Sequence, residues 1–384
     1  MPHTKHSQLA RPRLGRFGRN EWAFVGTSCG NIQRLAQQVV AALSERYRCA
    51  YLDADHAGAD GDKGAPGMLF TGTTLEYTDM IHSHQLRLST KLGSHQFRQL
   101  CNEIDLVLVN GNHHEAATQV VVIDPAKKNS LRKRLDQLTN VRLILLAGGV
   151  GEVFDFLENA LPNLANIPRL RLDDHVGIVR FFENEMLRST PPVNGLVLAG
   201  GRSIRMGHDK GGIDWHGKPQ REHLADLLHT CCAEVFISCR PDQALGSAYG
   251  LLPDTFTELG PYGAILSAFR QQPDRAWLVT ACDLPLLDRA TLDFLLKNRQ
   301  PQRVATAFQN PHDQMPEPLI TIWEPKSYAT LLAFLAQGYS CPRKVLLHSD
   351  ALILSAPDPA ALTNVNTPEE AELMSNDELR TQPR

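Results

Sequence analysis

The residues best suited to chemistry lie in one glycine-rich segment, residues 198–210, which reads Leu-Ala-Gly-Gly-Arg-Ser-Ile-Arg-Met-Gly-His-Asp-Lys. The adjacent Gly200 and Gly201 allow the backbone to approach an anion closely and to point N–H groups at it. Arg205 and Lys210 add positive charge. Chemistry at phosphorus depends on positioning and charge neutralisation more than on covalent help from the protein. The segment therefore predicts a site for a triphosphate.

A glycine pair alone is weak evidence, as a second copy in the same chain shows. Residues 146–149 repeat the letters Leu-Ala-Gly-Gly, but Val-Gly-Glu follows and no cation is present. We interpret this copy as the end of a strand and a turn, because it lacks the groups that hold phosphate.

Two aspartates follow apolar runs that we expect to be strands. Asp283 comes after residues 277–280, and Asp254 follows an apolar run that ends at Pro253. Ligands bind at the carboxyl ends of strands in open parallel sheets, and a carboxylate there can hold Mg²⁺ against phosphates. The alternative is that each aspartate initiates a turn or caps a helix.

The whole pattern at 198–210 resembles the signature of the molybdenum cofactor guanylyltransferases, the MobA-like proteins of the nucleotidyltransferase superfamily. Further segments follow in the family's order: Gly-Lys-Pro at 217–219, Leu-Pro-Asp at 252–254, Gly-Pro-Tyr-Gly-Ala at 260–264, Ala-Cys-Asp-Leu-Pro-Leu at 281–286 and Asn-Val-Asn-Thr-Pro-Glu-Glu at 364–370. The resemblance covers residues 193–374, nearly half of the chain.

The resemblance implies an enzyme that transfers GMP from GTP to the phosphate of molybdopterin and releases pyrophosphate. It implies that Arg205, Lys210 and Asp283 are catalytic and that Asp283 holds Mg²⁺, with Asn366 as a second candidate ligand. The implied nucleotide-binding residues are Leu198, Ala199, Gly200, Gly201, Lys210, Cys239, Asp254 and Asp283. The implied partners are GTP, molybdopterin and the proteins that insert molybdenum or mature molybdoenzymes.

Three positions leave alternatives open. Asn366 precedes Thr-Pro-Glu-Glu, a strong helix start, so it fits the N-cap region of a helix equally well. Cys239 stands where the family often has asparagine, and Gln220 where it often has an aliphatic residue. The departure at Cys239 keeps open a sister enzyme that uses CTP, or one that acts on a sugar or polyol phosphate.

The first half contains a second, altered phosphate-loop pattern. Residues 26–32 read Gly-Thr-Ser-Cys-Gly-Asn-Ile, without the lysine and the hydroxyl residue that end a working P-loop. The position of this segment makes the first half resemble a degenerate MobB-like GTP-binding domain. We expect that it no longer hydrolyses GTP and acts in docking or dimerisation, which also leaves a non-enzymatic cofactor carrier or adaptor open. His113 and His114 could suggest a metal site, but the argument is weak because the side chains of adjacent histidines usually point apart.

The elements that must position these residues indicate an α/β protein of two domains. Short apolar strands alternate with helical stretches, which predicts two mostly parallel sheets with helices on both faces, the second sheet in a Rossmann-like nucleotidyltransferase fold. We expect a disordered basic tail (1–20), the MobB-like domain (21–188), a proline-stiffened linker (189–192), the MobA-like domain (193–374) and a polar tail (375–384).

Composition excludes several classes of protein. The net charge of -3 gives no global reason to expect nucleic acid as a partner. No apolar run reaches the roughly 18 residues of a membrane helix. The eight cysteines form no C-x-x-C pair, which argues against zinc and fits reduced thiols in the cytoplasm.

Overall fold

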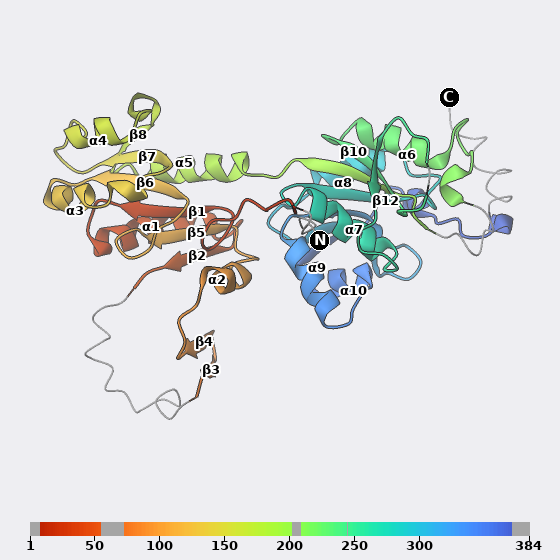
Figure 1. Cartoon of the computed structure of the whole chain (residues 1–384), viewed down its shortest axis with the longest axis horizontal. Helices are drawn as coiled ribbons and strands as arrows, with labels where there is room; N and C mark the ends of the chain where they lie inside the picture. Colours follow the sequence, from red (N-terminus) through yellow and green to blue (C-terminus); the bar gives the residue numbers. More distant parts are fainter. Residues whose placement is uncertain (1–7, 55–72, 202–208, 244, 371–384) are drawn as a thin grey trace, which may run out of the picture. The chain divides into compact units, whose positions relative to one another are not determined.

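The computed structural model describes residues 8–54, 73–201, 209–243 and 245–370. The chain divides into two compact units, and each is described by itself (Figure 1). The first is Leu14–Ser189; the second runs from Thr190 onward and includes the segment up to Arg13. The division falls inside the proline-containing segment 189–192.

The first unit contains a six-stranded parallel sheet in the order β2-β5-β1-β6-β7-β8. Its central strands are continuous apolar runs because helices cover both faces. The strands are β1 (Glu21–Val25), β2 (Cys49–Leu52), β5 (Leu106–Asn110), β6 (Thr118–Ile123), β7 (Val141–Leu146) and β8 (Arg169–Arg171). β7 ends at Leu146 and a turn with Gly149 at φ +80° follows, as we interpreted the second Leu-Ala-Gly-Gly copy.

Two helices cover one face of this sheet, and three shorter helices lie against the other. Helices α1 (Cys29–Leu43) and α5 (His175–Arg188) pack Ile32 and Phe182 against Phe24. On the opposite face, Leu131 and Leu157 pack against Val107. The helices of that face are α2 (Ser94–Leu100), α3 (Lys128–Arg132) and α4 (Asp155–Ala160), with 3-10 turns at Pro125–Lys127, Leu135–Gln137 and Leu164–Asn166.

Two parts of the first unit differ from the prediction. The segment 1–20 is not a disordered tail throughout: Phe17 is buried against Phe97, and the amides of Arg16 and Phe17 donate to the Glu21 carboxylate. The buried ring and carboxylate order this end of the segment, while residues 1–7 lie outside the described residues. The antiparallel hairpin of β3 (Leu75–Met80) and β4 (Ser83–Leu88) was not predicted, because its side chains are mostly exposed and show no apolar run.

The second unit contains a seven-stranded sheet in the order β11-β10-β9-β12-β14-β13-β15. Strand β14 runs antiparallel to its neighbours β12 and β13, and the other pairs are parallel. The predicted mostly parallel α/β architecture is therefore confirmed. The strands are β9 (Val193–Leu198), β10 (Val235–Cys239), β11 (Gly250–Pro253), β12 (Ala276–Ala281), β13 (Ala305–Gln309), β14 (Pro316–Trp323) and β15 (Ala351–Leu354).

Helices also cover both faces of the second sheet. On one face, Leu224 and Leu292 pack against Val197, and on the other, Tyr262 and Leu331 pack against Trp277. The first face carries α6 (Gln220–His229) and α8 (Arg289–Lys297). The second carries α7 (Pro261–Gln271), α9 (Ser327–Ala336) and α10 (Pro342–His348); 3-10 turns occur at Lys210–Gly212 and Pro359–Leu362. This packing fixes the strands whose carboxyl ends lead into the site.

All eight cysteines lie within the described residues and are free thiols. In the same part of the chain, no helix combines the length and the apolar character that crossing a bilayer requires.

Candidate functional site

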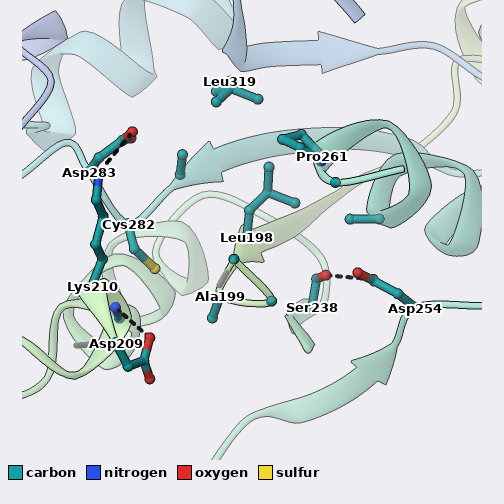
Figure 2. A pocket seen from close by; sticks show the side chains of 16 residues that line it. Leu198, Ala199, Asp209, Lys210, Ser238, Asp254, Pro261, Cys282, Asp283 and Leu319 are labelled. Carbon is teal, nitrogen blue, oxygen red and sulfur yellow. Dashed lines mark hydrogen bonds and ion pairs between the residues drawn. The ribbon is translucent and has the colours of Figure 1, made fainter. Parts of the chain in front are cut away.

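A pocket of about 260 Å³ opens where β9, β11 and β12 end (Figure 2). Seven of the predicted residues line it: Leu198, Ala199, Gly200, Gly201, Lys210, Asp254 and Asp283. Figure 2 shows Lys210 and Asp283 on one side and Ser238 with Asp254 on the other, with Leu198 and Ala199 between them. Residues far apart in the sequence therefore converge at the carboxyl edge of the sheet, where ligands bind in such folds.

The ammonium of Lys210 is held beside Asp283 by two hydrogen-bond acceptors. Its Nζ donates to the carbonyl of Val365 (3.1 Å) and to Oδ1 of Asn366 (2.8 Å), and lies 4.0 Å from Oδ2 of Asp283. Lys210 begins the 3-10 turn Lys210–Gly212, and the Asp209 side chain fixes the start of this turn by accepting from the amide of Gly211 at 3.0 Å. The positive charge is therefore placed in the pocket by bonds from two distant segments.

Asp283 offers a carboxylate oxygen that has no hydrogen-bond partner among the residues that the structure describes. Its side chain is 19% exposed, and Oδ1 is buried without a hydrogen bond to any described residue. Burial raises the pKa of Asp283, which the charge of Lys210 partly opposes. A buried carboxylate oxygen without a donor is costly unless a cation or ligand meets it. The residues present thus fit a hard divalent cation at Asp283.

Arg240 fixes the peptide groups of the glycine pair from outside the pocket. Its Nη1 donates to the carbonyls of Gly200 (3.2 Å) and Gly201 (3.3 Å). Because N–H and C=O point in opposite directions across a trans peptide, the amide of Gly201 faces away from Arg240. The Gly201 amide is therefore a candidate donor to an anion in the pocket, which both glycines line.

Asp254 lies against the other side of the glycine pair. The Ser238 hydroxyl donates to its Oδ1 at 2.8 Å, and a Cβ at Gly200 would lie 3.3 Å from its Oδ2. Glycine at position 200 therefore allows the close approach of backbone and carboxylate. Burial raises the pKa of Asp254 to about 6, and the Ser238 hydrogen bond opposes the shift.

The raised pKa of Asp254 gives a pH-dependent stability prediction. The folded state holds the proton more tightly than the unfolded chain, so this contribution is complete below pH 4 and is lost as the pH rises through 6. Asp254→Asn should therefore stabilise the protein at pH 7.5 by about 1–2 kcal/mol, after discounting for partial exposure, and much less at pH 4.5. Urea unfolding at both pH values measures the difference. An equal gain at both would contradict the assignment.

Of the other three predicted residues, the described ones, Cys239 and Asn366, do not line the pocket. Arg205 lies outside the described residues. Cys239 is buried at the end of β10 and contributes its carbonyl, which accepts from the amide of Asp254 at 2.9 Å. Asn366 contacts Lys210, and its backbone amide donates to the Glu370 carboxylate at 2.6 Å, an arrangement typical of a helix start. Its role as a metal ligand stays a prediction.

Sequence reasoning missed the supporting residues Ser238, Arg240 and Asp209. Ser238 was detectable in principle, because side chains alternate along a strand and the neighbour of a buried Cys239 points the other way. Arg240 and Asp209 act through backbone groups, which no residue pattern specifies.

In the first unit, side chains of the altered P-loop bond to one another and to neighbouring loops. Asn31 donates to Thr27 Oγ1 (2.9 Å), whose hydroxyl donates to Asp124 (2.8 Å). His113 Nε2 lies 3.3 Å from Cys29 Sγ, whereas the ring of His114 contacts the carbonyl of residue 53. Among the described residues, no group of three metal-ligating side chains occurs.

Comparison with known proteins assigns the second half. Residues 195–352 match the MobA-like NTP transferase domain. The chain is 37% identical over 186 residues to a molybdenum cofactor guanylyltransferase of Pseudomonas syringae, covering 90% of that protein and 46% of this chain. It is 35% identical over 187 residues to the protein of the same name from Pseudomonas aeruginosa, covering 92% of that protein and 47% of this chain.

A longer relative is the molybdenum cofactor biosynthesis bifunctional protein of Synechocystis. It is 34% identical over 185 residues, which are 47% of this chain and 53% of that protein. The match thus spans about half the length of this relative and nearly all of the two guanylyltransferases. The chain belongs to the molybdenum cofactor guanylyltransferase family, and its second half is a MobA-like nucleotidyltransferase domain.

Proposed function

We propose that this protein transfers GMP from GTP to the phosphate of molybdopterin, with Mg²⁺ at Asp283 and release of pyrophosphate. The observation that carries the proposal is the convergence of Lys210, Asp283 and the glycine pair in one pocket of a MobA-like domain. The names of the relatives favour GTP over the other nucleotides.

The charges of the pocket suit the displacement of pyrophosphate. An oxygen of the pterin phosphate attacks the α-phosphorus, and the bond from that phosphorus to the pyrophosphate oxygen breaks. The Gly201 amide and Lys210 hold phosphate oxygens whose negative charge grows as pyrophosphate leaves. Arg205 adds a second cation to the same loop. No covalent intermediate with the protein is needed.

Asp283 is the residue that would hold the metal. Its buried Oδ1 has no partner among the described residues, and carboxylate oxygens are the ligands that Mg²⁺ prefers. When bound there, Mg²⁺ supplies neutralisation of phosphate charge. Asn366 supports this arrangement by holding Lys210 beside the carboxylate. We assign nucleotide contacts to Asp254 and to the chain around Cys239 on the opposite side.

Pyrophosphate release tests the proposal and its competitors together. The full chain is incubated with Mg²⁺, molybdopterin and either GTP, CTP or ATP. Release with GTP alone is expected. Release with CTP alone would identify a cytidylyltransferase instead. No release with any nucleotide would favour a cofactor carrier or adaptor.

We propose that the first unit serves docking to molybdoenzyme maturation proteins or a second copy, and not GTP hydrolysis. The support is the altered loop, in which Asn31 occupies the position of the phosphate-binding lysine and bonds to Thr27. Calorimetry should therefore give one GTP per chain. A stoichiometry of two GTP per chain would indicate that the first unit also binds the nucleotide.

A further inference from the structure

The loop that carries Asp283 is anchored through three consecutive backbone carbonyls. The carbonyl of Asp283 accepts from the amide of Val365 at 2.8 Å. The carbonyl of Leu284 accepts from Nε2 of Gln220 at 3.1 Å, and that of Pro285 from Nε2 of His216 at 2.9 Å. Two of the three donors are thus side chains from a single short segment, residues 216–220.

Each of these two residues is itself held in place. Gln220 is fully buried at the first turn of α6, and its backbone amide donates to the carbonyl of Ile213 at 2.8 Å. His216 stacks on His223, with ring centroids 3.7 Å apart and planes 15° from parallel. Because a carbonyl only accepts, Nε2 of His216 carries a proton in this contact. A donor that is held in place fixes the peptide group it binds.

These hydrogen bonds to the loop backbone matter because few other contacts restrain the Asp283 carboxylate. Oδ1 of Asp283 has no hydrogen bond to the described residues, and Oδ2 meets Lys210 only at 4.0 Å. The direction of the carboxylate therefore depends on the backbone that carries it. Pro285 restricts Leu284 to extended conformations, which limits how far the backbone between Asp283 and the two following carbonyls can rearrange.

We propose that Gln220 and His216 are positioning residues that aim the Asp283 carboxylate at its cation by holding the carbonyls of Leu284 and Pro285. This inference rests on the proposed function, since it presumes a divalent cation at Asp283. It also gives a role to Gln220, which departs from the aliphatic residue expected at that position. A buried amide there replaces packing with a directed hydrogen bond.

The test compares GTP affinity with and without Mg²⁺ by calorimetry, in the full chain. Gln220→Leu removes the donor and keeps most of the side-chain volume. Outer-sphere partners of metal ligands affect metal affinity by about 10- to 100-fold, so the gain in GTP affinity on adding Mg²⁺ should shrink by about tenfold. Affinity in the presence of a chelator should stay unchanged, which a general loss of folding would not allow.

Two matched comparisons separate positioning from stability. Gln337→Leu removes a similar bond, from Nε2 to the carbonyl of Ala333 (3.2 Å), at the end of α9 and should leave the Mg²⁺ gain intact. His216→Phe keeps the stacked ring without the donor and should lower the gain, whereas His216→Gln retains a donor and should restore most of it. If Gln220→Leu does not fold, the two His216 variants decide the question.

The outcomes also show whether the positioning role or the proposed function itself is wrong. If the wild-type chain binds GTP and Mg²⁺ does not raise its GTP affinity, the proposed metal site is wrong. If Mg²⁺ raises the GTP affinity of the wild type, and raises that of Gln220→Leu and His216→Phe by the same factor, the metal site stands and the positioning role is wrong.

Discussion

Asp283→Asn is expected to lower kcat for guanylyl transfer by about 10²- to 10³-fold without lowering the Tm. The catalytic loss follows because a preorganised charge that acts on developing phosphate charge contributes at this scale. The Tm of Asp283→Asn is not expected to fall because burial raises the pKa of Asp283, which makes the ionised form of Asp283 unfavourable in the folded wild-type protein at neutral pH. Steady-state kinetics and a thermal melt of the same sample measure both.

Asp288→Asn provides the matched control for this variant. Asp288 lies five residues further on and caps α8 by accepting from the amide of Thr291 at 2.8 Å. Asparagine caps helices as well as aspartate, so this variant should keep full activity. A Tm loss of several degrees in Asp283→Asn together with normal kcat would contradict the assigned role.

The largest expected effect on stability comes from Arg299→Met. The guanidinium of Arg299 binds both oxygens of Glu324, at 2.7 and 2.8 Å, and donates to the carbonyl of Pro191 at 2.9 Å. The Glu324 side chain is 0% exposed. Removing one partner of such a pair leaves an uncompensated buried charge, so the second unit should lose about 3–5 kcal/mol of unfolding free energy.

Urea denaturation followed by tryptophan fluorescence measures this loss. Three of the four tryptophans belong to the second unit: Trp215, Trp277 and Trp323. Arg289→Met, which breaks an exposed pair with Asp293, should change the midpoint little. The double variant Arg299→Met/Glu324→Met should recover most of the loss, because no buried charge remains. A single variant as stable as wild type would show that the pair is not buried in solution.

Much of the site was predictable because its chemistry depends on residue type and on position after a strand. Asp283 follows the buried strand β12 and Asp254 follows the edge strand β11 of the same sheet, so the prediction that they flank a common edge needed only the α/β pattern. Gly200 and Lys210 were predicted from charge and backbone freedom. The pocket contains all four.

The supporting contacts were not predictable, because they run through backbone groups and depend on distant packing. No local pattern places Arg240 on the carbonyls of the glycine pair, or Gln220 on the carbonyl of Leu284. The antiparallel insertion of β14 between β12 and β13 likewise depends on the pairing of β14 with β12, which is distant in the sequence, and strand propensity does not specify the direction of that pairing. Phe17 was assigned to a disordered tail because one aromatic residue among basic ones carries no periodic signal.

Transfer of label from GTP to molybdopterin tests the central claim most directly. The chain is incubated with Mg²⁺, molybdopterin and GTP labelled at the α-phosphate, beside a second reaction labelled at the γ-phosphate. We expect α-label in a pterin dinucleotide and γ-label in pyrophosphate, with both products strongly reduced in Asp283→Asn. Label from the γ-phosphate released as inorganic phosphate, with none from the α-phosphate on the pterin, would contradict it.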